Sequence, residues 1–422
     1  MSTDSLLTTT QEQDKRPDAL SPGSLSLLSL MFGGFIGLGL LDGGGSVLWA
    51  DVLVVFGVSK GIFGLLSGLG LALAFPLLLF GGRLVERVDN RLLLALAFLG
   101  MGVACLGFLS GRGGIAVFAL ILLIRSLSVT LLDLANNALA MDFERATNRH
   151  VMSPLHAGFS GGTLAGAGLV WLVFAGGGGF RAVYLGLAVI MGMAMCWAIY
   201  LSRTTVLPHQ RQVNNVPPSM ALALLKRPDI RLFAILTGLS FGGEALISQW
   251  AAIYLRDERD FSARIGVFAI AAYGFSMFVG RVTNGPISNR LGKRLTIMLQ
   301  GGVTLVGGVL IFTGGPAIVA IVGCGLAGLG LAGPGPLALS LAGAAVPHAP
   351  GAASGATLAG GYLGFAGAPI LAGIIATTAS TRGVMVGVAL AGVLIVFMAL
   401  RMPKGQDDAS ATGTAAEATG LT

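Results

Sequence analysis

Long apolar runs separated by short polar segments dominate this chain of 422 residues. A helix needs about 20 apolar residues to cross the hydrocarbon core of a bilayer, and twelve runs meet that length. The runs are continuous rather than alternating, which excludes a membrane β-barrel. The sequence therefore predicts an all-α integral membrane protein with spans at 25–50, 58–80, 92–111, 114–141, 152–175, 182–201, 231–252, 264–284, 295–313, 316–345, 352–379 and 383–401.

The composition also agrees with an integral membrane protein. Only 11% of the residues are charged, against about 25% in soluble domains. The 66 glycines lie largely within the apolar runs, where small residues let membrane helices approach closely. The net charge of +7 sits in short segments between the runs, which is typical of a topology signal. We therefore expect the chain to reside in a lipid bilayer and not to bind nucleic acid.

The longest connection, 202–230, divides the spans six and six. We expect an N-terminal tail (1–24), a first six-helix bundle (25–201), the linker (202–230), a second bundle (231–402) and a C-terminal tail (403–422). Most of the 26 lysines and arginines fall on the side shared by the tails and the linker. By the positive-inside rule, both termini are predicted to be cytoplasmic, in a multi-pass protein of the inner or plasma membrane.

The two halves repeat one another. Residues 160–166 (SGGTLAG) and 354–360 (SGATLAG) are identical at every position but one, and each opens the fifth span of its half. Trp49-Ala50 and Trp250-Ala251 close the first spans. A Gly-x3-acid-Arg pattern at 82–91 returns at 285–294 with Asn289 in place of the acid. Matches displaced by six spans indicate a duplication in parallel orientation, the plan of a two-bundle transporter.

The Gly-x3-acid-Arg loop resembles the signature loop of the major facilitator superfamily. The second copy keeps Gly292, Lys293 and Arg294, whereas the first copy has Asp89 where a second glycine is expected. The resemblance implies twelve helices in two pseudo-symmetric six-helix bundles that rock about a substrate near the midplane. It also implies a protein that works as a monomer, without a cofactor.

Two further stretches look like the fucose-permease-like branch of that superfamily. They are residues 131–137 (LLDLANN) with 152–156 (MSPLH), and Glu244 with 249–256 (QWAAIYLR). In proton-coupled sugar symporters of that branch, an acid near the end of span one and an acid in span four carry the proton. The matching positions here are Asp51 and Asp133.

Asp133 is the strongest candidate for proton coupling from the residues themselves. A carboxylate deep in a span is expensive and is by default a functional hypothesis. At 100° per residue, Asn136 and Asn137 share its helix face, and their amides suit sugar hydroxyls. Asp42 is a third candidate. In a continuous helix it faces away from Asp51, unless the glycines at 43–45 break the helix.

Other polar residues in the spans are candidates for substrate binding, although each has a structural alternative such as an ion pair or a helix-end contact. Arg125 lies in span four, where it could pair with an acid or bind an anionic group. The expected substrate-binding set is Asn136, Asn137, Arg125, His156, Glu244, Gln249, Trp250 and Tyr273.

The signature loops are expected to gate rather than to bind substrate. An acid beside arginines at a helix end can form a charge-assisted network that holds two bundles together. The alternative is a pure topology signal, because lysine and arginine belong on that side in any case. The expected gating residues are Glu86, Arg87, Arg91, Arg290, Lys293 and Arg294.

The sequence favours secondary active transport of a small polar solute, a sugar or sugar derivative, by proton symport. A drug–proton antiporter is the first alternative, since such proteins also carry an arginine in span four. However, residues 161–166 contain no proline of the kind expected in span five. A non-transporting sensor is the second, disfavoured by the short tails. A Walker loop, zinc spacing and a nucleophile elbow are all absent from the sequence, so we expect neither an enzyme nor a metal site.

Overall fold

A computed structural model describes residues 22–147, 149, 151–204, 220 and 223–402. These residues form helices joined by short turns, and the apolar runs predicted as spans become the helices. They are α1 (Pro22–Phe56), α2 (Lys60–Arg87), α3 (Asn90–Ser110), α4 (Gly114–Thr147), α5 (Met152–Ala175), α6 (Phe180–Thr204), α8 (Pro228–Asp257), α9 (Ala263–Leu291), α10 (Lys293–Thr313), α11 (Ala317–Leu331), α12 (Pro334–Ala345), α13 (Pro350–Thr378) and α14 (Thr381–Leu400).

Within the described residues, 12 segments are long and apolar enough to cross a membrane, which confirms the all-α membrane fold. The predicted span 316–345 is interrupted, because α11 ends at Leu331 and α12 begins at Pro334. Proline has no backbone N–H and is favoured at the start of a helix, so Pro334 ends one helix and opens the next. The predicted linker lies mostly outside the described residues, and both predicted tails lie almost entirely outside them.

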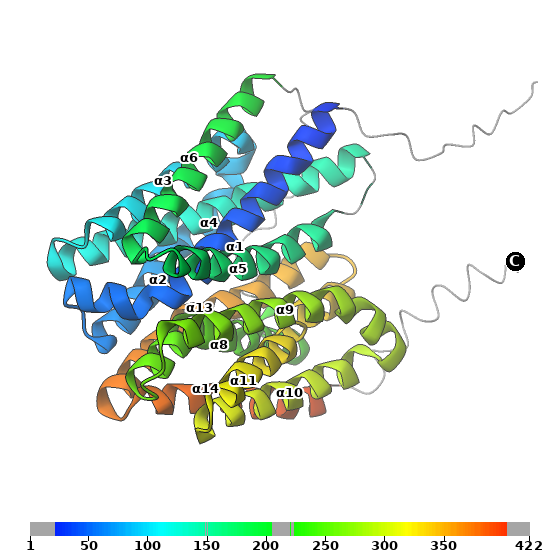
Figure 1. Cartoon of the computed structure of the whole chain (residues 1–422). Helices are drawn as coiled ribbons and strands as arrows, with labels where there is room; N and C mark the ends of the chain where they lie inside the picture. Colours follow the sequence, from blue (N-terminus) through cyan, green and yellow to red (C-terminus); the bar gives the residue numbers. More distant parts are fainter. Residues whose placement is uncertain (1–21, 148, 150, 205–219, 221–222, 403–422) are drawn as a thin grey trace, which may run out of the picture.

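The helices form two layers (Figure 1). Helices α1–α6 make the first bundle and α8–α14 make the second. The glycine-rich repeats have the same task in both bundles, namely close packing of the fifth span on the first. A methyl group on Gly166 of α5 would overlap the Leu40 carbonyl oxygen of α1. In the second bundle, a methyl group on Gly360 of α13 would overlap the Ala234 carbonyl oxygen of α8. Only glycine allows backbones to approach this closely.

Helix α1 is continuous from Pro22 to Phe56, so the glycines at 43–45 do not break it. Gly43 instead packs on the α5 backbone at Thr163, and Gly44 faces Leu187 of α6. Because the helix is unbroken, Asp42 and Asp51 lie on different faces and at different depths. The structure thus assigns these two acids to separate environments.

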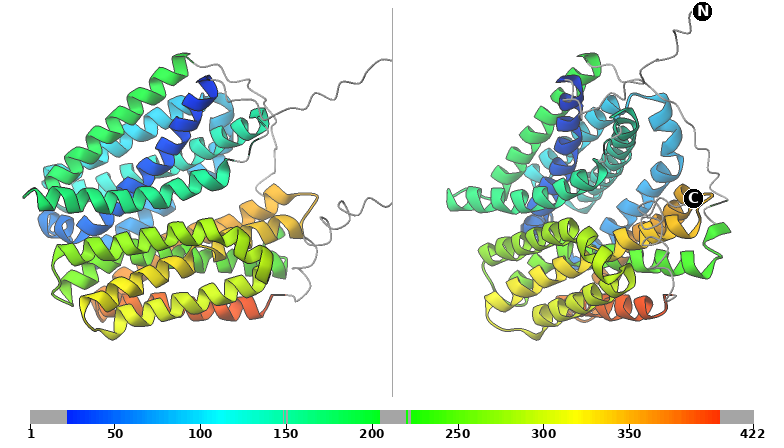
Figure 2. Two further views of the ribbon diagram at one scale, coloured as in Figure 1. Left: turned by 45° about the vertical axis from the view of Figure 1, so that its right-hand side comes forward. Right: turned by 90° about the vertical axis from the view of Figure 1, so that its right-hand side faces the viewer.

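The bundles meet near one end and diverge toward the other (Figures 1 and 2). We call the end that carries the turns 57–59, 111–113, 176–179 and 258–262 the closed end, and the end from which α1 starts the open end. Methyl groups on Gly61, Gly64 and Gly68 of α2 would all run into α13. These glycines fill only the first third of α2, so the two helices are in close contact over the part nearest the closed end.

Candidate functional site

A carboxylate of the first bundle and a phenol of the second join the two bundles. The hydroxyl of Tyr362 (α13) donates a hydrogen bond of 2.9 Å to Oδ2 of Asp133 (α4). Both residues are half-buried. Asp133 thus lies at the bundle interface, and its hydrogen-bond donor is a residue that sequence reasoning did not identify. Its role in proton coupling stays a prediction.

The two asparagines beside Asp133 have different environments. Asn137 Nδ2 donates to Asp133 Oδ1 at 2.9 Å and also to the Asp133 carbonyl oxygen at 2.8 Å. Asn136 is fully buried, and its Nδ2 donates to the Met31 carbonyl oxygen of α1 at 3.0 Å. Asn137 therefore shares the Asp133 site as expected, whereas Asn136 contributes a contact between α4 and α1.

A second polar cluster centres on Arg281 of α9. Its Nη1 donates to Ser160 Oγ of α5 at 3.0 Å, across the bundle interface. Its Nη2 forms an ion pair of 3.2 Å with Glu244 Oε2 of α8, within the second bundle. The guanidinium also lies 5.6 Å from the centre of the Phe159 ring. One arginine thus holds an acid of its own bundle and a hydroxyl of the other.

Asp42 and Tyr273, both predicted as site residues, lie near this cluster without a direct hydrogen bond to it within the described part of the chain. Asp42 of α1 lies within electrostatic range of both Arg125 and Arg281. Tyr273 of α9 is buried and lies within range of Glu244, Asp42 and Arg281. Two acids and two guanidinium groups from four helices therefore share the membrane interior. Such a set is far less costly together than any one of its charges alone.

His156 lies between the two sites. Its ring centre is 4.5 Å from that of Phe35, and it lies within electrostatic range of both Asp133 and Arg281. The side chain is exposed rather than packed in a bundle core. Its exposure leaves it accessible to a bound molecule, and substrate binding by His156 stays a prediction.

Arg125 lies against an aromatic ring of the first bundle. Its guanidinium lies 5.7 Å from the centre of the Trp49 ring, a cation–π geometry. It lines a small cavity together with Cys105, Phe108 and Tyr184. Within the described part of the chain, we find no carboxylate within 4.0 Å of this arginine. Its charge is therefore balanced at longer range by Asp42.

Trp250 differs from the expectation that it faces substrate, whereas substrate binding by the half-buried Gln249 stays a prediction. Trp250 is fully buried and packs on Phe63 of α2, with ring centres 5.5 Å apart. This pair is an apolar contact between the bundles. Neither Trp250 Nε1 nor Gln249 Oε1 has a hydrogen-bond partner among the described residues.

Two ion pairs cross between the bundles at the closed end. Asp51 of α1 pairs with Arg256 of α8 at 2.5 Å, and Lys60 of α2 pairs with Asp257 of α8 at 2.9 Å. These side chains keep between 25% and 40% of their surface exposed. Asp51, predicted as a proton-coupling acid, is therefore a partner in a bundle-to-bundle ion pair near the membrane edge.

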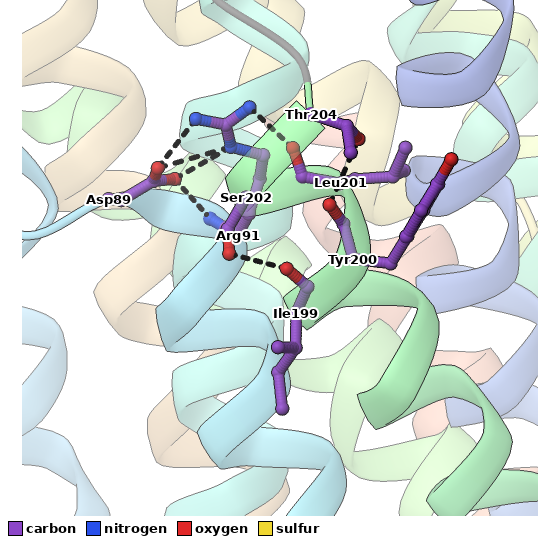
Figure 3. Close-up of polar contacts among 7 residues, drawn as sticks. All are labelled: Asp89, Arg91, Ile199, Tyr200, Leu201, Ser202 and Thr204. Carbon is purple, nitrogen blue, oxygen red and sulfur yellow. Dashed lines mark hydrogen bonds and ion pairs between the residues drawn. The ribbon is translucent and has the colours of Figure 1, made fainter.

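The first signature loop fastens helices of its own bundle (Figure 3). Asp89 caps α3 by accepting from the Arg91 backbone N–H at 2.9 Å, and its carboxylate pairs with the Arg91 guanidinium at 2.6 Å. The Arg91 Nη1 donates to the Leu201 carbonyl oxygen at the end of α6 at 2.9 Å. Asp89 thus explains why this copy lacks the second glycine: the acid caps the helix that follows.

The second loop repeats this arrangement with a glycine turn. Gly292 has φ of +80°, a conformation that favours glycine. Arg294 donates to the Ala399 and Leu400 carbonyl oxygens at the end of α14, and Lys293 donates to Ser340 of α12. Arg87 and Arg290 are exposed at the open end, and the side chain of Glu86 lies outside the described part. Gating by these loops stays a prediction.

Sequence reasoning did not identify Arg281, Tyr362, Ser160, Lys60 and Asp257 as site residues. Arg281 carried a usable signal, because a charge within the predicted span 264–284 is costly unless it is paired. Tyr362 had a weaker signal, as one of only five tyrosines in the chain. The ion pairs with Arg256 and Asp257 depend on how the bundles meet, which no local pattern encodes.

Comparison with known proteins gives consistent results. The family model of the Major Facilitator Superfamily matches residues 27–368. An uncharacterised transporter of Sinorhizobium fredii is 29% identical over 384 residues, which are 87% of this chain and 95% of that protein. An uncharacterised MFS-type transporter of Yersinia pestis is 27% identical over 373 residues, covering 86% and 92%.

Solved structures of transporters share the fold. A variant of the nucleoside transporter NupG superposes with a TM-score of 0.74 at 16% identity, covering 90% of this chain and 100% of that one. A bacterial homolog of the human lysosomal transporter Spinster, in an inward-facing and occupied conformation, gives 0.67 at 15% identity, covering 92% and 99%. At such low identity these likenesses show the architecture alone.

Proposed function

Because the chain belongs to the major facilitator superfamily of membrane transporters, we propose that it moves a small polar solute by alternating access, coupled to protons in symport. The solute binds between the bundles, close to Asp133, His156 and the Arg281 cluster. Its transport requires the bundles to separate at the closed end and to meet at the open end. The protein has no enzymatic activity of its own.

The hydrogen bond between Asp133 and Tyr362 carries this proposal. A phenol donates more strongly to a charged carboxylate than to a neutral acid, so the bond is strongest when Asp133 carries no proton. A proton on Asp133 therefore weakens a link between the bundles. Protonation and bundle movement are thereby connected at one pair of atoms, which is what symport demands.

The substrate class follows from the groups around Asp133. Asn137 and His156 offer donors and acceptors suited to hydroxyl groups. The arginines of the neighbouring cluster are already balanced by Asp42 and Glu244, which favours an uncharged solute. Sugars and sugar derivatives, including nucleosides, fit this description. The fold shared with a nucleoside transporter adds one such compound to the test panel.

We further propose that the open end faces the cytoplasm, as the distribution of lysine and arginine predicts. Single cysteines at Arg112 and Asp260, both exposed at the closed end, should react with an impermeant thiol reagent added to intact cells. A cysteine at Arg290, exposed at the open end, should react only after permeabilisation. The reverse pattern would invert the topology.

Transport is tested with purified protein in proteoliposomes and a panel of radiolabelled sugars, nucleosides and amphipathic drugs. An inward proton gradient should drive uptake of a polar solute. Asp133→Asn should abolish gradient-driven uptake while keeping exchange of solute at equal pH on both sides. Expulsion of a drug against an opposite gradient would instead establish the antiporter. Equal uptake with and without the gradient would remove proton coupling.

A further inference from the structure

Glu244 is a buried acid whose two carboxylate oxygens have unequal surroundings. The residue is 5% exposed. Oε2 is paired with the Arg281 guanidinium at 3.2 Å, whereas Oε1 is buried and has no hydrogen-bond partner within the described part of the chain. A charged carboxylate needs compensation at both oxygens when water is excluded. Glu244 is thus incompletely compensated as an anion.

The guanidinium that compensates Glu244 is shared. Arg281 also donates to Ser160 of the other bundle at 3.0 Å, and it lies within electrostatic range of Asp42. Asp42 and Glu244 are themselves close enough to repel one another. Two acids from two helices therefore draw on one guanidinium.

The titratable groups that face Glu244 come from few elements. Helix α9 supplies Arg281 and Tyr273, and α1 supplies Asp42. Of the other elements packed on α8, α12 has no titratable residue and α11 contributes Cys324, which lies beside Tyr273.

The remaining two packed helices offer no further charge to Glu244. Tyr362 of α13 is bonded to Asp133. In α14, Arg382 is bonded at the closed end to the Phe312 carbonyl oxygen. Arg281 is consequently the one cation within hydrogen-bond distance of Glu244 among the described residues.

We propose that Glu244 is a second proton-binding residue, and that its proton controls the hold of Arg281 on the first bundle. This rests on the proposed proton-coupled transport and adds a site in the opposite bundle. A proton from the aqueous phase forms an O–H bond at Oε1 and neutralises the acid. Arg281 then loses its ion-pair partner and is free to leave Ser160 or to shift toward Asp42. Release of the proton on the other side restores the pair, with no redox change.

Infrared difference spectroscopy of the purified protein in nanodiscs tests this directly. A step from alkaline to acidic buffer should reveal the C=O stretching band of a protonated buried acid. That band should be lost in Glu244→Gln and kept in Asp133→Asn. It should also be kept in Glu258→Gln, a matched control whose carboxylate is bonded to Thr381 at the closed end. A full set of bands in Glu244→Gln would overturn the proposal.

Arg281→Gln provides an independent route that remains open if Glu244→Gln does not fold. Without the guanidinium, the acid should keep its proton in more alkaline buffer, so its band should persist where that of the wild type has disappeared. A band that disappears at the same pH as in the wild type would contradict the proposal. If only a band removed by Asp133→Asn titrates, the proposed function stands and Glu244 is not a proton site. If only the Glu244 band titrates, the assignment of Asp133 fails instead.

Transport stoichiometry separates the two sites further. In proteoliposomes with a set voltage and pH gradient, Glu244→Gln should carry one proton fewer per transported solute than the wild type. An unchanged ratio of protons to solute would show that Glu244 holds no transported proton.

Discussion

The hydroxyl of Tyr362 donates a hydrogen bond of 2.9 Å to the carboxylate of Asp133 across the interface between the two bundles. A hydrogen bond to a charged group contributes roughly 1.5–3 kcal/mol. Tyr362→Phe keeps the ring and removes the donor. We expect the variant to bind solute but to couple poorly, with gradient-driven uptake reduced about 10-fold or more.

Tyr200→Phe is the matched control, because Tyr200 is 56% exposed on the outer face of α6 and stacks on Trp197. It should transport like the wild type. Uptake by Tyr362→Phe at the wild-type rate, with the same ratio of protons to solute, would show that the bond to Asp133 has no part in coupling.

The ion pair between Asp51 and Arg256 should stabilise the closed end against opening. Exposed pairs contribute about 0–1 kcal/mol each and are screened by salt, so the effect should be a population shift rather than a block. Distances between spin labels at Arg112 and Asp260 report on this end. Asp51→Arg should lengthen them, and the swap Asp51→Arg with Arg256→Asp should restore them.

High salt should lengthen the same distances in the wild type, because the Lys60 and Asp257 pair is screened as well. If Asp51→Arg leaves the distances unchanged while the protein stays folded, these pairs do not set the conformation. If Asp51 instead carries the coupled proton, Asp51→Arg should make uptake independent of the proton gradient and leave the label distances at the closed end unchanged.

Gly64 allows α2 and α13 to touch across the bundle interface. A methyl group at this position would overlap the Pro369 carbonyl oxygen, and a backbone group of a helix cannot move aside as a side chain can. Gly64→Ala should therefore hold the closed end apart and slow transport about 10-fold, the effect of roughly 1.4 kcal/mol. Gly168→Ala is the control, since a methyl group there meets nothing within 4 Å. Equal label distances in the two variants would rule out this contact as a limit on closure.

The sequence was sufficient to predict the spans, because a bilayer imposes a fixed length of apolar helix and leaves few alternatives. It was also sufficient to single out Asp133, which the structure places at the bundle interface, since the cost of burying a charge is local to that residue. The break at Pro334 was readable in the same way, although the predicted span 316–345 did not use it.

Residues that act between the bundles were harder to predict. Asn136 and Asn137 are neighbours on one helix, yet one is buried against α1 and the other faces Asp133. The pairing of Asp51 with Arg256, 205 positions away, depends on the rotation of one bundle against the other. Such contacts arise from the docking of two preformed units, which hydrophobic periodicity does not describe.

Arg91 and Arg294 are equivalent residues of the duplicated loop, and each fastens the last helix of its bundle through carbonyl oxygens. Arg91 is 8% exposed, so removal of its side chain takes a hydrogen-bond donor away from the Leu201 carbonyl oxygen and a charged partner away from Asp89. That loss costs about 1–3 kcal/mol. Arg91→Ala should therefore lower the unfolding temperature, measured by a thermal shift assay in detergent. Arg91→Lys should not restore the unfolding temperature fully, since one ammonium group cannot reach both Asp89 and Leu201 as the planar guanidinium does.

Arg87→Ala and Arg290→Ala, at the exposed positions, should keep the wild-type unfolding temperature and ligand binding. They should shift label distances between Ala146 and Asn289 at the open end if these arginines gate. A destabilised Arg87→Ala would show instead that it fastens a bundle, and unchanged distances would reduce the exposed arginines to a topology signal.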